Sequence, residues 1–358
     1  MRGFARDLAR RARAAGAGWT AGLLIVLAAA CGAPAGYGDG NEGAAAGALT
    51  ERPGGPGSAA SAELRSSDPA LSGGEVRSPT IDLPLVSVDG RLLTQVTVEG
   101  VGTHWFIIDT AAGRSLISAD LRRELDVPDS DVRLSLVTGA TGQSIMEFVR
   151  LPALHVGNAA HETPWVIVAD IPDFRRYGER EVNGILGVDV LADYDVVFDV
   201  PSGVLRLHPR DGSAEQRLGS ATSGVPFHSS VADGFIQFTA VLHGDSVPAL
   251  LDTGAQTGTM NWRAAALAGV AADSDGVRED ARGARGMNGR SMAAHRYTFD
   301  SLCIGGRCLP PTELRILDLP VFDAIGGKDA PAVLFGVDVL YDCALLLSYS
   351  TKRLHVCV

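Results

Sequence analysis

The chain has 358 residues, 46% of them hydrophobic and 20% charged, which predicts a globular protein of about two domains. Its net charge is −11, and the first 30 residues contribute +4 through five arginines and one aspartate, so the remainder carries −15. An acidic body of this kind repels phosphate backbones, which argues against nucleic acid as a partner.

Residues 1–31 have the pattern of an export signal. An arginine-rich stretch precedes an apolar run at 21–30, which is too short to span a bilayer comfortably and ends in "LAAAC". This ending resembles a bacterial lipobox with Cys31 as the lipidated residue, while the alanines at 28–30 also suit ordinary signal peptidase. We favour the lipobox, because lipidation of Cys31 leaves an even number of cysteines for disulfides. The expected product is an exported lipoprotein of the cell envelope, anchored in the membrane.

Residues 32–79 are rich in Gly, Ala, Ser and Pro and nearly free of large apolar side chains. They bury too little surface to offset their chain entropy, so we expect a disordered tether. From residue 80 onward, short β-rich runs such as "LPLVSVDGRLLTQVTVEG" alternate with turn residues. This texture predicts an all-β fold.

The part from residue 80 contains an internal repeat. Each half reads in the same order: a hairpin, an Asp-Thr motif, a short helix, a long β region, a Gly-Val-Asp-Val-Leu segment and a closing hairpin. The Asp-Thr motifs are "FIIDTAAGRSLI" at 106–117 and "ALLDTGAQTGTM" at 249–260. The downstream segments are "ILGVDVL" and "LFGVDVL", whose glycines follow the aspartates by 78 and 84 residues.

These paired motifs resemble the aspartic proteases of the pepsin and retropepsin type, particularly the retropepsin-like bacterial families. The resemblance covers nearly all of residues 80–358 and implies a bilobal acid-protease-like fold. An N-terminal lobe, 80–215, and a C-terminal lobe, 222–358, would be β-barrel-like with short helices and a cleft between them. It further implies a monomer that acts on peptides or proteins without cofactor or metal. The implied residues are catalytic Asp109 and Asp252, supported by Thr110, Ala111, Thr253, Gly254, Gly187 and Gly336.

A carboxyl pair also makes chemical sense without the family. Two carboxylates held a few ångströms apart share one proton, so the pair supplies a base and an acid for hydrolysis by water. The threonines can hydrogen-bond to the opposite loop, and glycine permits close backbone approach. Asp189 and Asp338 follow the downstream glycines, where we expect them to cap the next turn.

Ala111 departs from the Asp-Thr-Gly pattern. Its Cβ costs about 1–2 kcal/mol if the backbone is left-handed there, and it could crowd Asp252 or a bound water. The flap of the first lobe is expected in "SLVTGATGQSIMEF", with Gly139 and Gly142 at its tip. The matching stretch "ARGARGMNGRSMAAHRY" reads as a second flap or as a Gly-rich surface loop, and we favour the flap.

Four cysteines remain besides Cys31. The hairpin around "LCIGGRCL" brings Cys303 opposite Cys308, and the final hairpin places Cys343 opposite Cys357. A metal site is not expected, since no Cys-x-x-Cys occurs and the histidines are scattered.

Three functions are compatible with this pattern. The first is an aspartic endopeptidase, which we favour. The second is a non-catalytic member of the same fold that binds a peptide or an envelope partner in the old cleft, with Ala111 as its main support. The third is a structural lipoprotein without a ligand.

Overall fold

From Thr80 onward the chain forms short strands joined by turns. The computed structural model describes residues 26–27, 80–139, 142–162, 164–170, 174–218, 224–229, 235–285, 291–326, 329–340 and 342–358. The predicted lipidation site, Cys31, and the predicted tether, 32–79, lie outside the described residues.

Strands greatly outnumber helices among these residues, which confirms the predicted all-β class. The strands are β1 (Val26–Leu27), β2 (Ile81–Pro84), β3 (Val86–Val88), β4 (Arg91–Val98), β5 (Gly102–Ile108), β6 (Leu116–Ser118), β7 (Val132–Gly139), β8 (Gly142–Arg150), β9 (Ala153–Val156), β10 (Ala159–Glu162), β11 (Trp165–Ala169), β12 (Arg176–Tyr177), β13 (Arg180–Leu186), β14 (Tyr194–Asp199), β15 (Val204–Pro209), β16 (Val225–Pro226), β17 (His228–Ser229), β18 (Ile236–Leu242), β19 (Asp245–Leu251), β20 (Thr259–Met260), β21 (Arg278–Arg285), β22 (Ser291–Phe299), β23 (Leu302–Ile304), β24 (Arg307–Cys308), β25 (Thr312–Ile316), β26 (Val333–Phe335), β27 (Leu345–Ser348) and β28 (Arg353–Val356). The helices are α2 (Ala119–Glu124), α3 (Val188–Leu191), α4 (Ser213–Leu218), α5 (Trp262–Leu267) and α6 (Asp323–Gly326), with 3-10 turns η1 (Asp129–Asp131), η3 (Pro320–Phe322) and η4 (Val337–Val339).

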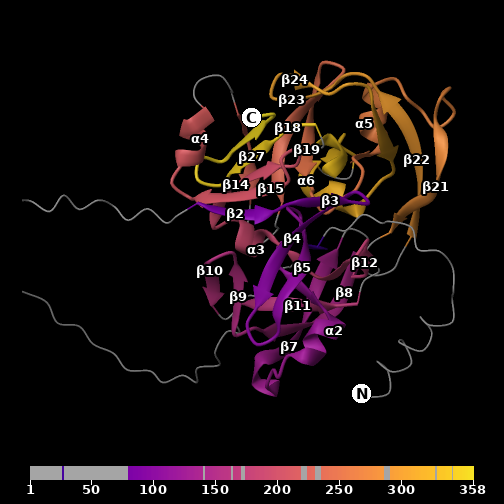
Figure 1. The fold of residues 1–358 in the computed structure, drawn as a ribbon. Coiled ribbons are helices and arrows are strands. Elements are labelled where there is room, and N and C mark those ends of the chain that lie inside the picture. The colour runs from indigo at the N-terminus through magenta and orange to yellow at the C-terminus, as the bar shows by residue number, and fades with distance from the viewer. Residues whose placement is uncertain are drawn as a thin grey trace, which may run out of the picture. The chain divides into compact units, whose positions relative to one another are not determined.

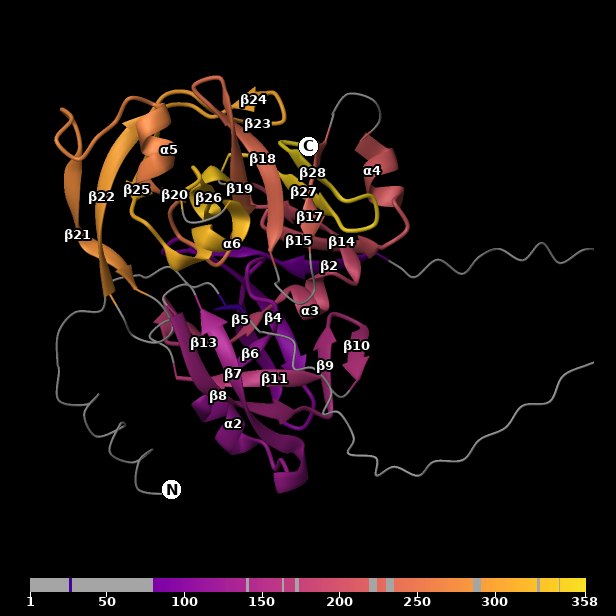
Figure 2. The same cartoon turned by 180° about the vertical axis from the view of Figure 1, so that it is seen from behind.

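Two large sheets repeat the same strand order, one in each half of the chain. The first runs β7-β8-β11-β6-β13-β5-β4-β9-β10, and the second runs β21-β22-β25-β20-β26-β19-β18-β23-β24. The side strand β3 on β4 corresponds to β17 on β18, whereas β12 on β13 and β1 on β7 have no counterpart among the described residues. In Figure 1 the first sheet forms the indigo-to-magenta lobe and the second forms the orange-to-yellow lobe, and Figure 2 shows them from behind. The sequence repeat is therefore a structural repeat.

A third sheet of six strands is shared by the two halves, in the order β16-β28-β27-β14-β15-β2. At its centre the closing hairpins of the two halves meet, because β14 pairs antiparallel with β27 and Val196 lies opposite Leu347. Both side chains are fully buried in the largest hydrophobic cluster, which draws residues from both halves. This sheet joins the two repeats into one body.

The strand that leads into each Asp-Thr motif is buried at successive residues. Phe106, Ile107 and Ile108 are fully buried at the end of β5, and Leu250 and Leu251 are buried at the end of β19. Each strand pairs in parallel with the strand before the downstream glycine, β5 with β13 and β19 with β26. A continuous apolar run is the expected sequence of a strand covered on both faces.

The predicted short helices after the motifs are present as α2 and α5. Ser118 Oγ accepts a hydrogen bond from Leu121 N at 3.0 Å, and Asn261 Oδ1 accepts one from Ala264 N at 2.8 Å. Both are N-cap bonds, which satisfy a helix-end N–H and define where the helix begins. Among the described residues no helix is long and apolar enough to cross a membrane.

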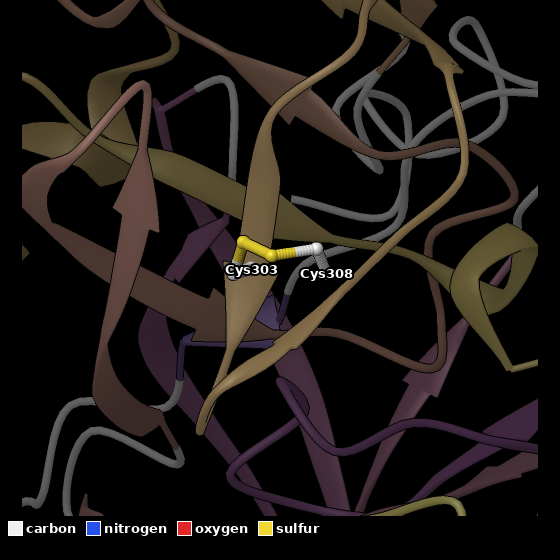
Figure 3. The surroundings of a disulfide bond; sticks show 2 residues. All are labelled: Cys303 and Cys308. Atoms are coloured by element: carbon white, nitrogen blue, oxygen red, sulfur yellow. A yellow bond between two sulfur atoms is a disulfide. The ribbon is translucent and has the colours of Figure 1, made fainter.

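Both expected disulfides form. Cys303 and Cys308 lie opposite each other on β23 and β24 and are bonded, as Figure 3 shows. The bond between Cys343 and Cys357 closes the final hairpin of β27 and β28. Both cross-links are local, within the second half of the chain.

Candidate active site

The two Asp-Thr loops meet through their threonines. Thr110 Oγ1 donates to Leu251 O and Thr253 Oγ1 donates to Ile108 O, each at 2.9 Å. Each hydroxyl also accepts the opposite threonine N–H, with N···O distances of 3.1 and 3.0 Å. All four bonds are buried and cross between the halves, so the loops hold each other at a fixed separation.

The aspartates that precede these threonines are fully buried. Asp109 Oδ1 accepts the N–H of Ala111, and Asp252 Oδ1 accepts the N–H of Gly254, both at 2.8 Å. The second oxygen, Oδ2, of each carboxyl is buried and accepts no hydrogen bond from an N–H or hydroxyl of the described residues. The two carboxyl side chains interact electrostatically with each other. The two Oδ2 atoms are therefore the oxygens available to a water and a shared proton.

Burial sets the protonation of this pair. It raises the pKa of Asp109 to about 7, against the lowering effects of the Ala111 N–H and the Arg91 charge. Burial and the charge of Asp109 together raise the pKa of Asp252 well above its ordinary value. Two acids in one buried site do not ionise together cheaply, so over a range of pH the pair holds one proton.

The residues after the two Asp-Thr pairs, Ala111 and Gly254, have different surroundings. A Cβ on Gly254 would lie 2.4 Å from the Asp109 Cγ and Oδ2 atoms, so this residue has no room for a side chain. Ala111 carries its methyl group with an ordinary negative φ, since it is not among the residues with positive φ. The left-handed cost considered from the sequence therefore does not arise. Its methyl group belongs to a buried cluster whose other members, including Phe235 and Leu334, come from the second half.

Gly187 and Gly336 let the downstream segments pass close to the loops. Val188 N donates to Ala112 O, and Val337 N donates to Ala255 O, both at 2.8 Å. A Cβ on Gly187 would lie 2.7 Å from the Ala112 oxygen, and one on Gly336 would lie 2.8 Å from the Ala255 oxygen. Their φ values, −99° and −90°, are open to any residue, so close approach explains these glycines.

The expectation that Asp189 and Asp338 cap the turns after Gly187 and Gly336 is wrong. The N-caps of α3 and η4 are the glycines, with no side-chain cap bond. Asp189 Oδ1 accepts the N–H and the hydroxyl of Ser115 at 2.8 Å, and Asp338 Oδ2 accepts the Gly258 N–H at 2.8 Å. These carboxyls thus hold the chain just after each Asp-Thr motif. Burial raises the pKa of Asp189, and raises that of Asp338 to about 6.

The predicted flaps are two β-hairpins in matching places. β7 and β8 end with Gly139 opposite Gly142, and β21 and β22 form the equivalent pair in the second sheet. The second stretch is therefore a paired hairpin over its described length. The connecting residues 140–141 and 286–290 lie outside the described part, and movement of either hairpin stays a prediction.

Sequence reasoning missed Arg91, the first residue of β4. Its side chain is fully buried, and its guanidinium donates to Gly254 O in the loop of the other half. Arginine is almost never fully buried without a partner, but in the sequence it stands between a turn and an amphipathic strand, where an exposed position is equally natural. Across the described ranges no cluster of His, Cys, Asp and Glu could hold a metal ion.

A carboxyl pair held between two similar all-β lobes by Asp-Thr loops defines the bilobal aspartic protease class. The chain belongs to the aspartyl protease family, whose sequence model matches residues 94–190 and 238–339. Both Asp-Thr loops and both downstream glycines fall within these segments. No curated protein matches the chain. Among solved structures, it is similar to the aspartic proteinase of Irpex lacteus, with 16% identity, 78% of this chain and 97% of that chain covered, and a TM-score of 0.49.

Proposed function

We propose that the protein is an aspartic endopeptidase whose water is activated by Asp109 and Asp252. The observation that carries the proposal is the buried carboxyl pair, in which each Oδ1 is bound by a backbone N–H and each Oδ2 is left free of other donors. The family supports peptide bonds as the substrate.

In the proposed reaction the pair starts with one proton. The ionised carboxylate takes a proton from water as the water oxygen attacks the peptide carbonyl carbon, and the protonated partner gives its proton to the carbonyl oxygen. The first carboxyl then gives the proton it took from water to the amide nitrogen. As the C–N bond breaks, one of the two hydroxyl groups on the former carbonyl carbon returns a proton to the carboxyl pair. The products are a carboxylic acid and an amine. We assign the two roles to the pair and not to single residues.

An extended substrate would bind as an added strand. The pairing of β1 with β7, with Val26 opposite Gly139, supports this, because there an extended segment of the chain itself pairs with the edge of the first hairpin. Main-chain bonds of this kind give affinity without strict side-chain preference.

Digestion of a denatured protein between pH 4 and pH 9 tests the proposal. Activity should rise as the pair becomes singly ionised, at a pH near 7, and not in strong acid. It should vanish in Asp109→Asn and Asp252→Asn and with a transition-state-mimic inhibitor. If the wild type binds peptides but cleaves none over the whole range, the protein is a binding module of the same fold.

We further propose that the protein is exported and anchored through a lipid on Cys31, supported by the arginine-rich start and the "LAAAC" ending. Mass spectrometry of the N-terminal peptide from cells should find a diacylglyceryl cysteine at residue 31. An unmodified N-terminus at Cys31 or at residue 32 would favour ordinary secretion.

A further inference from the structure

Arg91 is buried beside the carboxyl pair but belongs to neither Asp-Thr loop. It follows a tight turn in which Asp89 and Gly90 have φ values of 47° and 72°. This turn joins β3 to β4 and delivers the arginine to the interior, where it is among the largest fully buried side chains.

The turn lies directly against the loop of the other half. Gln256 Nε2 donates to Asp89 O, and a Cβ on Gly90 would lie 3.1 Å from the Gln256 Cβ. The Arg91 guanidinium donates to Gly254 O, and Gly254 N donates in turn to Asp252 Oδ1. One residue of the first half therefore contacts the backbone that positions the catalytic carboxyl of the second.

A carboxyl pair with one proton carries a full negative charge. Such a charge is costly in a buried site unless an opposite charge lies near it. The charged groups with the largest effect on the pair are the carboxyls themselves, after β5 and β19, and Arg91 at the start of β4. Burial raises the pKa of both carboxyls, and the Arg91 charge opposes that rise in both.

We propose that Arg91 is the buried counter-charge of the carboxyl pair: it fixes the second Asp-Thr loop from the first half of the chain and stabilises the singly ionised state that hydrolysis requires. It is a positioning residue, since it acts through Gly254 and through its charge. The inference rests on the proposed function for its catalytic meaning, while its effect on the ionisation of the pair does not require activity.

The kinetic test compares Arg91→Met and Arg91→Lys with wild type. Arg91→Met should move the acid limb of the kcat/KM profile to higher pH by about one unit. At a pH below the limb, kcat/KM should therefore be about tenfold lower than in wild type. Arg91→Lys, which keeps the charge, should leave the limb close to that of wild type while lowering kcat. Arg206→Met is the matched control, because it removes the same charge from a partly exposed pair with Asp82. A folded Arg91→Met protein with the wild-type limb overturns the proposal.

A stability test decides the point if no variant cleaves peptides or if Arg91→Met folds poorly. The melting temperature of Arg91→Met should fall further below wild type at pH 8, where the pair is ionised, than at pH 4, where it is neutral. Adding Asp109→Asn and Asp252→Asn together should recover most of the loss at pH 8, because two amides leave no negative charge to neutralise. An equal deficit at both pH values with no recovery in the triple variant means that Arg91 is only a packing residue. If the protein does not cleave peptides, the proposed function is overturned, but the stability comparison still tests the role of Arg91.

Discussion

The third residues of the two loops show how one methyl group can matter at one position and not at its counterpart. Gly254 faces the carboxyl of Asp109, whereas the Ala111 methyl group is part of a hydrophobic cluster. The two halves are thus similar in backbone but not in what surrounds this position. Ala111 therefore gives the non-catalytic reading no support through backbone strain.

Exchanging these residue types gives the first prediction. Gly254→Ala should lower kcat/KM at least about a hundredfold, because its Cβ would lie 2.4 Å from the Asp109 carboxyl and the carboxyl would have to move by about an ångström. Ala111→Gly is the matched control and should keep activity within about threefold while losing about 0.5–1 kcal/mol of stability to chain entropy. Kinetics and urea denaturation measure both. Strong activation of Ala111→Gly would show that the methyl group crowds the site after all.

The raised pKa of Asp109 gives a prediction about stability. Burial raises this pKa from 3.8 to about 7, so between these values the folded protein binds more protons than the unfolded chain. The free energy of unfolding therefore falls as pH rises from about 4 to about 7. Asp109→Asn should reduce this fall by roughly 2–4 kcal/mol.

Urea denaturation at pH 4 and pH 8 measures that difference, with the exposed Asp245→Asn as control. An Asp109→Asn protein that loses as much stability as wild type between the two pH values would show that the carboxyl is not held in its neutral form.

At the scale of elements, each Asp-Thr loop rests on a segment from about eighty residues later. The glycine of that segment passes under the loop, and the next aspartate binds the chain after the motif through Ser115 or Gly258. The sequence predicts the segments from their repetition. It does not predict the aspartate contacts, because a carboxyl three residues after a strand caps a turn as readily as it reaches a neighbouring loop.

Gly336→Ala tests this support. Its Cβ would lie 2.8 Å from the backbone oxygen of Ala255, which a buried loop cannot easily relieve. We expect a loss of about 2–3 kcal/mol in the free energy of unfolding, together with reduced kcat, and Gly187→Ala should behave alike. Full stability and activity in Gly336→Ala would show that the segment can shift without cost.

At the scale of the whole molecule, much of the architecture follows from the repeat. Two Asp-Thr loops, two downstream segments, the short helices and both local disulfides are all readable from residues close in sequence or from the comparison of the two halves. The central pairing of β14 with β27 is not, since Val196 and Leu347 lie 151 positions apart and carry no mutual signal. Arg91 was missed for the same reason: its partner, Gly254, lies 163 positions away in the other half.

The central claim is that Asp109 and Asp252 hydrolyse peptide bonds as a pair. The most direct measurement is kcat/KM for a cleaved peptide at the pH optimum, in wild type and in Asp252→Asn with an unchanged circular dichroism spectrum. The account predicts a loss of at least about a thousandfold, since an amide can serve neither as the general acid nor as the general base that the second carboxyl supplies. Equal rates in the two proteins would contradict it and would place any cleavage outside this site.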